Sequence, residues 1–268
     1  MGTCSPVGVF DSGIGGLTVV KELRSLLPQE NIIYFGDTAR TPYGSRPPAE
    51  ILSFMQQILC FFSAQQVKLA VVACNTMTAL GLEIARKRCS FPIVGVNLGI
   101  RSALAASKKK CIGVIATQAT VACGKHGQVA HEFAPEATVY PQACPKFVPL
   151  IENEQLTGAA VEVAAREYLV PLKEAHVDAL ILGCTHYPFI RPVLERIMDI
   201  HTVIIDPARD TAVDASELLR KKQLLNNQQS GTVRFCFSAD TDRARRMAAH
   251  LFAEQLPEFE IVNLQDYQ

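Results

Sequence analysis

Apolar residues in this chain fall into two kinds of segment, short continuous runs and longer stretches with helical spacing. Continuous runs are typical of strands covered on both faces, as in a parallel sheet. They occur at residues 7–10, 32–35, 69–73, 93–96, 112–116, 179–182, 203–205, 233–237 and 261–264. Between them, residues 51–62 repeat apolar side chains on one helix face. Strands that alternate with helices predict an α/β fold of mostly parallel sheets flanked by helices.

Two segments of the first half of the chain are echoed in the second half. Residues 7–12 resemble residues 112–117, and residues 69–76 resemble residues 179–186. Chance similarity among buried strands is one explanation, and duplication of an α/β unit is the other. Duplication predicts two pseudo-symmetric lobes, each with one cysteine at the carboxyl end of a strand, where open α/β sheets bind ligands.

Composition and charge narrow the function classes. The chain has 268 residues, of which 49% are hydrophobic, so it can bury a large core. Lys and Arg together number 26, as do Asp and Glu, and this neutral balance predicts neither nucleic acid nor a membrane surface as a partner. The nine cysteines form no CxxC pair, and no signal peptide precedes the first strand. We therefore expect a cytoplasmic protein with free thiols.

The two strand-end cysteines carry the candidate chemistry. Cys74 is followed by Asn-Thr and Cys184 by Thr-His, at turns where free backbone N–H groups attract carboxylates and favour thiolates. A single cysteine in such a place is more often a small core residue. Two thiols on opposite sides of one carbon could remove an α-proton on one face and return it on the other, because a thiol pKa is near neutral.

Three further residues could manage the protons of these thiols. Asp11 ends the first strand, His186 lies two residues after Cys184, and Glu152 lies in a proline-rich stretch. Each also has an ordinary structural explanation. Asp11 could be a helix cap before the glycine turn, His186 could be a hydrogen-bonded turn residue, and Glu152 could be a solvated helix residue.

Four motifs occur in a fixed order along the chain. They are Asp-Ser-Gly-Ile-Gly-Gly-Leu-Thr-Val at 11–19, Phe-Gly-Asp-Thr-Ala-Arg-Thr-Pro-Tyr-Gly-Ser-Arg at 35–46, Ala-Cys-Asn-Thr at 73–76 and Leu-Gly-Cys-Thr-His-Tyr-Pro at 182–188. Together they resemble the glutamate racemase family over residues 7–215. One motif alone is weak evidence, whereas four in the right order are a specific match.

The resemblance implies a cofactor-independent racemase that supplies D-glutamate for peptidoglycan, with its active site between two lobes, and a homodimer. The lobes would be residues 1–98 with 209–268, and residues 99–208. Cys74 would handle the proton of D-glutamate and Cys184 that of L-glutamate, supported by Asp11, Glu152 and His186. The implied substrate-holding residues are Ser12, Pro42, Tyr43, Gly44, Asn75, Thr76, Thr117, Thr120 and Thr185.

The sequence departs from the family pattern at five positions, and it leaves other functions open. The departures are Asn97, Ala116, Cys123, His126 and Pro207, and they are expected to affect details of the hinge, the rim and efficiency. A racemase specific for aspartate, a cysteine hydrolase using Cys184 with His186, and a binding protein without turnover are the alternatives. No lysine context suggests pyridoxal phosphate, and no histidine spacing suggests a metal site.

Overall fold

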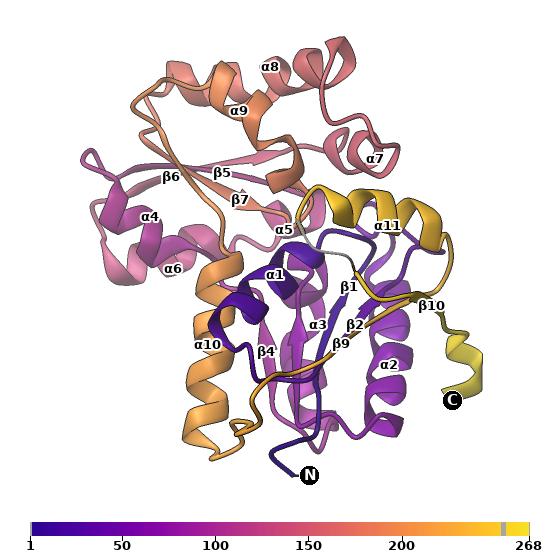
Figure 1. Cartoon of the computed structure of the whole chain (residues 1–268). Helices are drawn as coiled ribbons and strands as arrows, with labels where there is room; N and C mark the ends of the chain where they lie inside the picture. The colour runs from indigo at the N-terminus through magenta and orange to yellow at the C-terminus, as the bar shows by residue number, and fades with distance from the viewer. Residues whose placement is uncertain (1, 253–255, 268) are drawn as a thin grey trace. The chain divides into compact units, whose positions relative to one another are not determined.

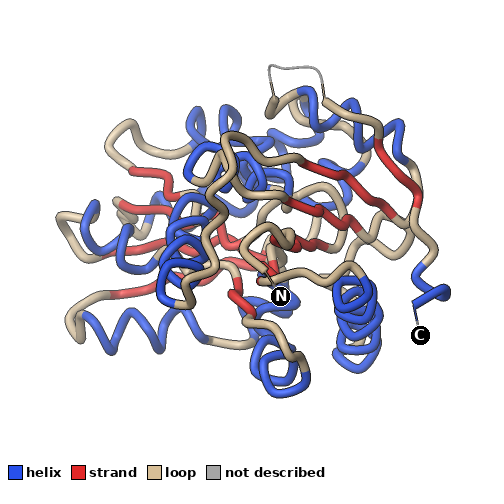
Figure 2. The backbone as a smooth tube through the Cα atoms, turned by 60° about the horizontal axis from the view of Figure 1, so that its bottom comes forward, coloured by secondary structure: helices blue, strands red, loops and turns tan. Residues whose placement is uncertain are grey.

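The computed structural model describes residues 2–252 and 256–267. The chain divides into two compact units, Met1–Asn97 with Ala208–Gln268, and Leu98–Pro207. Each unit contains one parallel sheet with helices, which confirms the predicted α/β fold. Figure 2 separates the strands of the two sheets (red) from the helices (blue).

The first unit is built on a six-stranded sheet in the order β10-β9-β2-β1-β3-β4. All of its strand pairs are parallel. The strands are β1 (Val7–Asp11), β2 (Ile32–Gly36), β3 (Leu69–Val72), β4 (Ile93–Gly95), β9 (Val233–Phe237) and β10 (Phe259–Ile261). Every residue of β1, β2 and β3 is buried, as their continuous apolar runs predicted.

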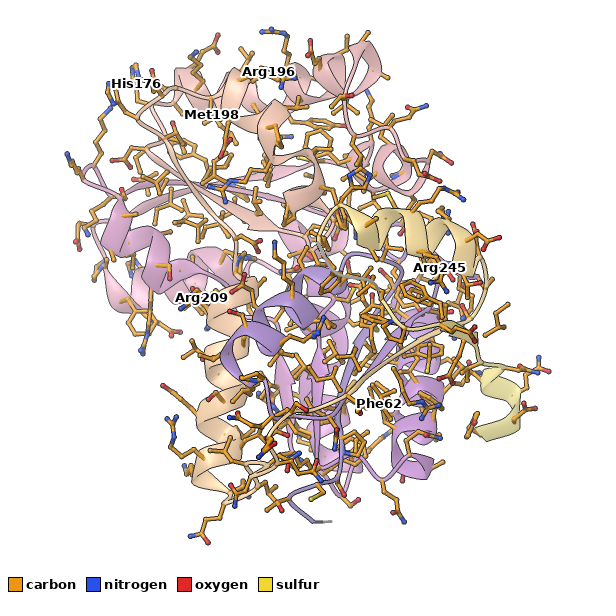
Figure 3. The ribbon with its side chains drawn as sticks, in the orientation of Figure 1. Phe62, His176, Arg196, Met198, Arg209 and Arg245 are labelled. Carbon is orange, nitrogen blue, oxygen red and sulfur yellow. The ribbon has the colours of Figure 1, made fainter. Side chains whose placement is uncertain are left out.

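The helices of the first unit pack against its sheet. They are α1 (Leu17–Leu26), α2 (Pro48–Ala64), α3 (Asn75–Arg88), α10 (Ala208–Lys221), α11 (Thr241–Ala249) and a terminal 3-10 helix, η2 (Leu264–Tyr267) (Figure 1). α2 and α3 share one core with the sheet face that presents Phe10. Phe62 of α2, labelled in Figure 3, meets Phe10 edge-on with ring centroids 5.6 Å apart.

The second unit has a four-stranded parallel sheet in the order β6-β5-β7-β8. Its strands are β5 (Cys111–Ala116), β6 (Thr138–Ala143), β7 (Ala179–Gly183) and β8 (Val203–Ile205). Its helices are α4 (Ile100–Ala106), α5 (Gln118–Ala122), α6 (Lys125–Phe133), α7 (Phe147–Glu152), α8 (Ala159–Glu174), η1 (Tyr187–Ile190) and α9 (Arg191–Ile197). None of the helices in the described part of the chain has the length and apolar character needed to cross a bilayer.

The two sheets share a topology and a register. The order β2-β1-β3-β4 corresponds to β6-β5-β7-β8. Within it, Val7 pairs with Leu69 in the first unit, and Ile112 pairs with Ala179 in the second. These four residues are the starts of the segments that echo each other in the sequence. Agreement of order and register favours duplication of one unit over chance similarity of strands.

Two strands differ from the sequence prediction. β6 was not predicted, because it is an edge strand whose residues are exposed or half-buried and which contains Pro141. The strand expected at residues 261–264 lies earlier, at Phe259–Ile261, and η2 begins at Leu264. Leu264 belongs to the 3-10 helix and is buried, whereas Ile261 belongs to the strand and is exposed. The apolar run at 261–264 therefore did not coincide with the strand.

Replacement of Gly36 by alanine is expected to lower the free energy of unfolding by roughly 1–3 kcal/mol, the usual cost of overpacking. A Cβ there would lie 2.4 Å from the carbonyl oxygen of Gly13 and 2.7 Å from the ring of Phe237. Gly127, inside α6, has open space where a Cβ would stand. Gly127→Ala is the matched control and is expected to be neutral or stabilising by up to about 1 kcal/mol. Urea denaturation of both variants checks the difference, and equal stabilities would contradict it.

Candidate active site

The first candidate half-site lies at the carboxyl edge of the sheet in the first unit. β1 ends at Asp11, and Cys74 follows β3 and caps the start of α3. The thiol of Cys74 donates to the hydroxyl of Ser12 over 3.7 Å, and both residues are buried. Since β1 and β3 are neighbours in the sheet, two segments far apart in sequence place their polar residues at one edge.

The carboxylate of Asp11 has a structural role at the end of β1. Its side chain is fully buried, and its Oδ1 accepts a hydrogen bond of 2.9 Å from the backbone N–H of Gly13. This bond orders the glycine turn that leads into α1. The carboxylate of Asp11 is thereby fixed at the end of β1, next in sequence to Ser12. Asp11 is not the helix cap that the sequence also allowed, since Gly16 is the N-cap residue of α1.

The first turn of α3 supplies further polar groups. Asn75 and Thr76 open this helix and are buried. The Oδ1 of Asn75 has no hydrogen-bond partner among the described residues. A buried acceptor of this kind calls for an explanation. A substrate ammonium group is a donor that would satisfy it, and the N-terminus of α3 favours a nearby carboxylate.

Pro42, Tyr43 and Gly44 lie on the loop between β2 and α2. The peptide bond between Thr41 and Pro42 is cis. The side chain of Tyr43 is buried, and its hydroxyl donates to the carboxylate of Asp37. Burial and the negative charge of Asp37 raise the pKa of Tyr43, which keeps the phenol a neutral donor. The side chain of Tyr43 is therefore part of the core, and this residue can hold a ligand only through its backbone.

The second candidate half-site is a chain of three buried side chains in the second unit. Cys184 directly follows β7, and Glu152 is the last residue of α7. The thiol of Cys184 lies 3.9 Å from Nδ1 of His186. On the other side of the ring, Nε2 of His186 lies 2.6 Å from Oε1 of Glu152. Glu152 and His186, which are 34 positions apart in sequence, are thus in direct contact.

The surroundings of His186 favour its charged form. Burial by itself would lower the pKa, but the hydrogen bonds to Cys184 and Glu152 and the charge of Glu152 together raise the pKa of His186 well above 6.5. The imidazolium held by Glu152 places a positive charge 3.9 Å from the sulfur atom of Cys184. His186 can therefore hold a proton next to the thiol of Cys184, which is the candidate base.

Three threonines of the second unit are buried near the same strand ends. Thr117 follows β5 and caps α5, where its hydroxyl oxygen accepts from the backbone N–H of Thr120 over 3.4 Å. The two hydroxyl oxygens lie 3.0 Å apart. Thr185 stands between the two members of the cysteine–histidine pair. Since β5 and β7 are paired, these neutral hydroxyls belong to the edge that carries Cys184.

One buried thiol near Cys184 was not recognised from the sequence. Cys144 follows the edge strand β6 and is fully buried, and its carbonyl oxygen accepts a hydrogen bond of 3.2 Å from the hydroxyl of Tyr187. Burial and then the charge of Cys184 raise the pKa of Cys144, so it stays a neutral thiol. This position was not evident from the sequence because β6 was not predicted. It is β6 that places Cys144 at the carboxyl end of the same sheet as Cys184.

The departures noted in the sequence occupy defined positions. The backbone N–H of Asn97 donates to Thr211 over 2.9 Å, and its side chain donates to Asp214 over 2.7 Å, all within the first unit. His126 is buried in α6, and burial lowers its pKa to about 4, which leaves it neutral. Pro207 lies close to where a Cβ of Gly99 would stand. In residues 2–252 and 256–267 no cluster of three potential metal-binding side chains is found.

Comparisons with known proteins agree with one another. A family described as Asp/Glu/Hydantoin racemase matches residues 17–215. A glutamate racemase of Synechocystis is 44% identical over 235 residues, which cover 87% of this chain and 84% of that protein. The crystal structure of glutamate racemase from Francisella tularensis in complex with D-glutamate is 37% identical, with a TM-score of 0.88 and coverage of 99% of this chain and 100% of that one. A glutamate racemase isoform from Bacillus anthracis has a TM-score of 0.90 at 34% identity, covering 97% and 98% of the two chains.

Proposed function

This chain belongs to the Asp/Glu/Hydantoin racemase family, and we propose that it is a glutamate racemase that works through two cysteines. The observation that carries the proposal is the repeated placement of a buried cysteine. Cys74 follows β3 and Cys184 follows β7, and these strands correspond in the two duplicated sheets. Each thiol has a polar partner in its own unit, Ser12 for Cys74 and His186 for Cys184.

In the proposed reaction the two thiols act on opposite faces of one α-carbon. With L-glutamate, the thiolate of Cys184 takes the α-proton, and the electron pair of the broken C–H bond passes into the adjacent carboxylate group. The thiol of Cys74 then gives its proton to the other face of the carbon and becomes a thiolate. D-glutamate reacts by the reverse steps, so no proton or electron is left over.

The neighbouring acids and the imidazole would keep the two thiols in opposite protonation states. A protonated His186, held by Glu152, stabilises the thiolate of Cys184 before the proton transfer. On the other side, Asp11 ends the strand next to Cys74 and Ser12. We propose that the carboxylate of Asp11 supports proton transfer at Cys74.

Glutamate fits the neutral polar groups of the two half-sites. The proposed binding residues are Ser12, Asn75, Thr76, Thr117, Thr120 and Thr185, with the backbone of residues 42–44. Hydroxyls, an amide and helix N-terminal N–H groups suit carboxylates without neutralising them, while Asn75 Oδ1 suits the ammonium group. The D-glutamate complex of the Francisella tularensis relative supports this substrate class.

The wider role follows the family resemblance. We propose that D-glutamate made by this enzyme enters peptidoglycan and that the enzyme acts in the cytoplasm without a cofactor.

The lobes and the assembly also follow the resemblance. We propose lobes of residues 1–98 with 209–268 and of residues 99–208, and we propose that the enzyme is a homodimer. Size-exclusion chromatography with light scattering tests the dimer, and a monomer at micromolar concentration would contradict it.

One other activity has an observation in its favour. The series Cys184, His186 and Glu152 has the order of a nucleophile, a base and an orienting acid, as a cysteine hydrolase requires. This activity has no use for Cys74. Cys74→Ser therefore separates the two, since a hydrolase would keep its activity and a two-cysteine racemase would lose it.

The proposed function is tested with purified protein and no added cofactor. L-glutamate is expected to lose its circular dichroism signal until both enantiomers are equal. L-aspartate is expected to react at least about tenfold more slowly, since one methylene is worth roughly 1–3 kcal/mol of discrimination. No reaction with either enantiomer of glutamate, in a folded protein, would refute the proposal.

Glu152→Gln is expected to move the alkaline limb of the pH–rate profile to lower pH. The carboxylate helps to raise the pKa of His186, so an uncharged amide leaves the imidazolium less stable. The maximal rate is expected to fall by less than about tenfold, because glutamine keeps an acceptor oxygen. Initial rates of L-glutamate racemisation across the alkaline range check this. Glu167→Gln, which alters an exposed ion pair with Lys146 in the same unit, is the control, and equal profiles would contradict the role of Glu152.

The same shift predicts how stability depends on pH. The pKa of His186 is higher in the folded protein than its ordinary value of 6.5. Its protonated form therefore stabilises the fold fully below about pH 6.5, and this contribution is lost as the pH rises through the raised pKa. In Glu152→Gln this contribution is expected to be smaller and to be lost completely at a lower pH, which thermal denaturation over the same pH range can measure.

A further inference from the structure

The segment between β2 and α2 carries proposed substrate contacts but has no regular secondary structure. We call residues 37–47 the substrate loop. It begins beside the first half-site, since the backbone N–H of Asp37 donates to the carbonyl oxygen of Asp11 over 3.0 Å. Backbone groups of residues 42–44 can serve a ligand only if the loop is held still. Side chains must supply that restraint.

Arg40 joins the substrate loop to α2. Its Nε donates to Asp37 Oδ2 over 2.7 Å, and its Nη1 donates to Gln57 Oε1 over 2.6 Å. Its guanidinium also stands 4.0 Å from the centroid of the Phe54 ring. Gln57 and Phe54 both belong to α2. A planar guanidinium can make these hydrogen bonds and stack on the ring at the same time.

Tyr43 shares two of these partners with Arg40. Its hydroxyl donates to Asp37, and its ring lies 5.4 Å from the ring of Phe54. Any shift of the Arg40 guanidinium that moves Asp37 or Phe54 therefore moves Tyr43. The backbone of residues 42–44 would move with it, because the buried side chain of Tyr43 has no free space in which to reorient.

The other side of Asp37 is fixed by the segment after β9. The hydroxyl of Ser238 donates to Asp37 Oδ1 over 2.8 Å and accepts from the backbone N–H of Ala39 over 2.9 Å. Thr38 and Ala239 also exchange hydrogen bonds. Asp37 is thus anchored on the sheet side whether or not Arg40 is present. Arg40 connects this anchor to Gln57 and Phe54 of α2. The loop also reaches α2 through Tyr43, which contacts Phe54, and through Arg46, which contacts Glu50 and Phe54.

We propose that Arg40 is a positioning residue, whose guanidinium holds the backbone of residues 42–44 in place for a substrate carboxylate without touching the substrate. This proposal rests on the proposed racemase function. In this proposal the loop binds the side-chain carboxylate of glutamate, which takes no part in the proton transfers. The anchor therefore stabilises the bound substrate and the transition state by equal amounts. Loss of the anchor therefore raises KM and leaves kcat nearly unchanged.

Arg40→Lys is the variant that isolates the anchor. Lysine keeps the positive charge beside Asp37 but has neither the fork that reaches Gln57 nor the plane that stacks on Phe54. KM is expected to rise about tenfold for both enantiomers, since small misplacements of binding groups have large effects. Gln57→Ala removes only the hydrogen bond between Arg40 and α2 and leaves the contact with Phe54, so KM is expected to rise by about threefold.

Two measurements on the intact protein test this proposal. The first is KM and kcat with L- and D-glutamate for wild type, Arg40→Lys and Gln57→Ala. The second is hydrogen–deuterium exchange of residues 37–47 without substrate, which is expected to be faster in Arg40→Lys. Arg86→Lys, which changes an arginine of α3 bonded to Ile93 and exposed Glu83, is the control and is expected to behave as wild type.

The outcomes separate the anchor from the activity. A raised KM with faster exchange in the loop supports the proposal. Unchanged exchange, or faster exchange with unchanged KM, would overturn it, because Arg40 would then be dispensable or only structural. A fall in kcat at constant KM would also overturn it. An inactive wild-type protein would instead refute the proposed function before any variant is compared.

Discussion

Replacement of either Cys74 or Cys184 by alanine is expected to abolish racemisation in both directions, with a loss of at least about 10³-fold in kcat/KM. Each direction needs one cysteine to take the proton and the other to return it. Both thiols are buried at strand ends, and each has its own polar partner. Cys144 lies at the same sheet edge as Cys184, but burial raises its pKa and keeps it a neutral thiol, so we do not expect it to take over the role of Cys184.

The two alanine variants are expected to differ in what remains. Cys184→Ala still allows Cys74 to exchange the α-proton of D-glutamate with solvent, and Cys74→Ala allows the corresponding exchange of L-glutamate. Proton NMR in deuterium oxide measures both. Cys60→Ala, a half-buried thiol of α2, is the control and should retain full activity. Exchange of L-glutamate alone in Cys184→Ala would reverse the assignment of the two faces.

His186→Asn is expected to lower kcat/KM by roughly 10²–10⁴-fold, the usual contribution of a positioned acid or base. The imidazole lies between Cys184 and Glu152, and its proton stabilises the thiolate that starts the reaction from L-glutamate. The two enantiomers have equal free energy, so kcat/KM must fall equally in both directions. A loss confined to one direction in kcat/KM is therefore excluded by thermodynamics.

A kinetic isotope effect shows which proton transfer His186 serves. In His186→Asn the step at Cys184 is slowed, so it becomes more rate-limiting. The isotope effect is then expected to rise with α-deuterated L-glutamate and to fall with α-deuterated D-glutamate. His131→Asn, an exposed residue of α6, is the control. Equal isotope effects in the variant and wild type would contradict a role of His186 at Cys184.

Apolar patterning predicted the strands that carry the site because their ends are buried. β1, β3, β5 and β7 are almost wholly inaccessible to solvent, and continuous apolar runs report such burial directly. Cys74 and Cys184 could be found from the sequence because they come immediately after such runs. β6 could not, since an exposed edge strand has no apolar run to mark it.

Side-chain partnerships were predictable only where a motif carried them. The sequence suggested Glu152 and His186 separately, but their contact depends on how α7 meets the end of β7. The bond between Asp37 and Ser238 spans 201 positions and left no signal in either segment. The motif also favoured the whole residue Tyr43 as a ligand group, whereas its side chain is a core contact of Asp37 and Phe54.

The central claim, that two cysteines act on opposite faces of one carbon, is tested most directly with wild-type protein in deuterium oxide. L-glutamate is incubated until only a small fraction has reacted, and the α-position of each enantiomer is then analysed. The D-glutamate formed is expected to carry solvent deuterium while the remaining L-glutamate keeps its proton, because different groups remove and return it. D-glutamate that retains the original proton, or deuterium appearing equally in both enantiomers from the start, would contradict the two-cysteine account.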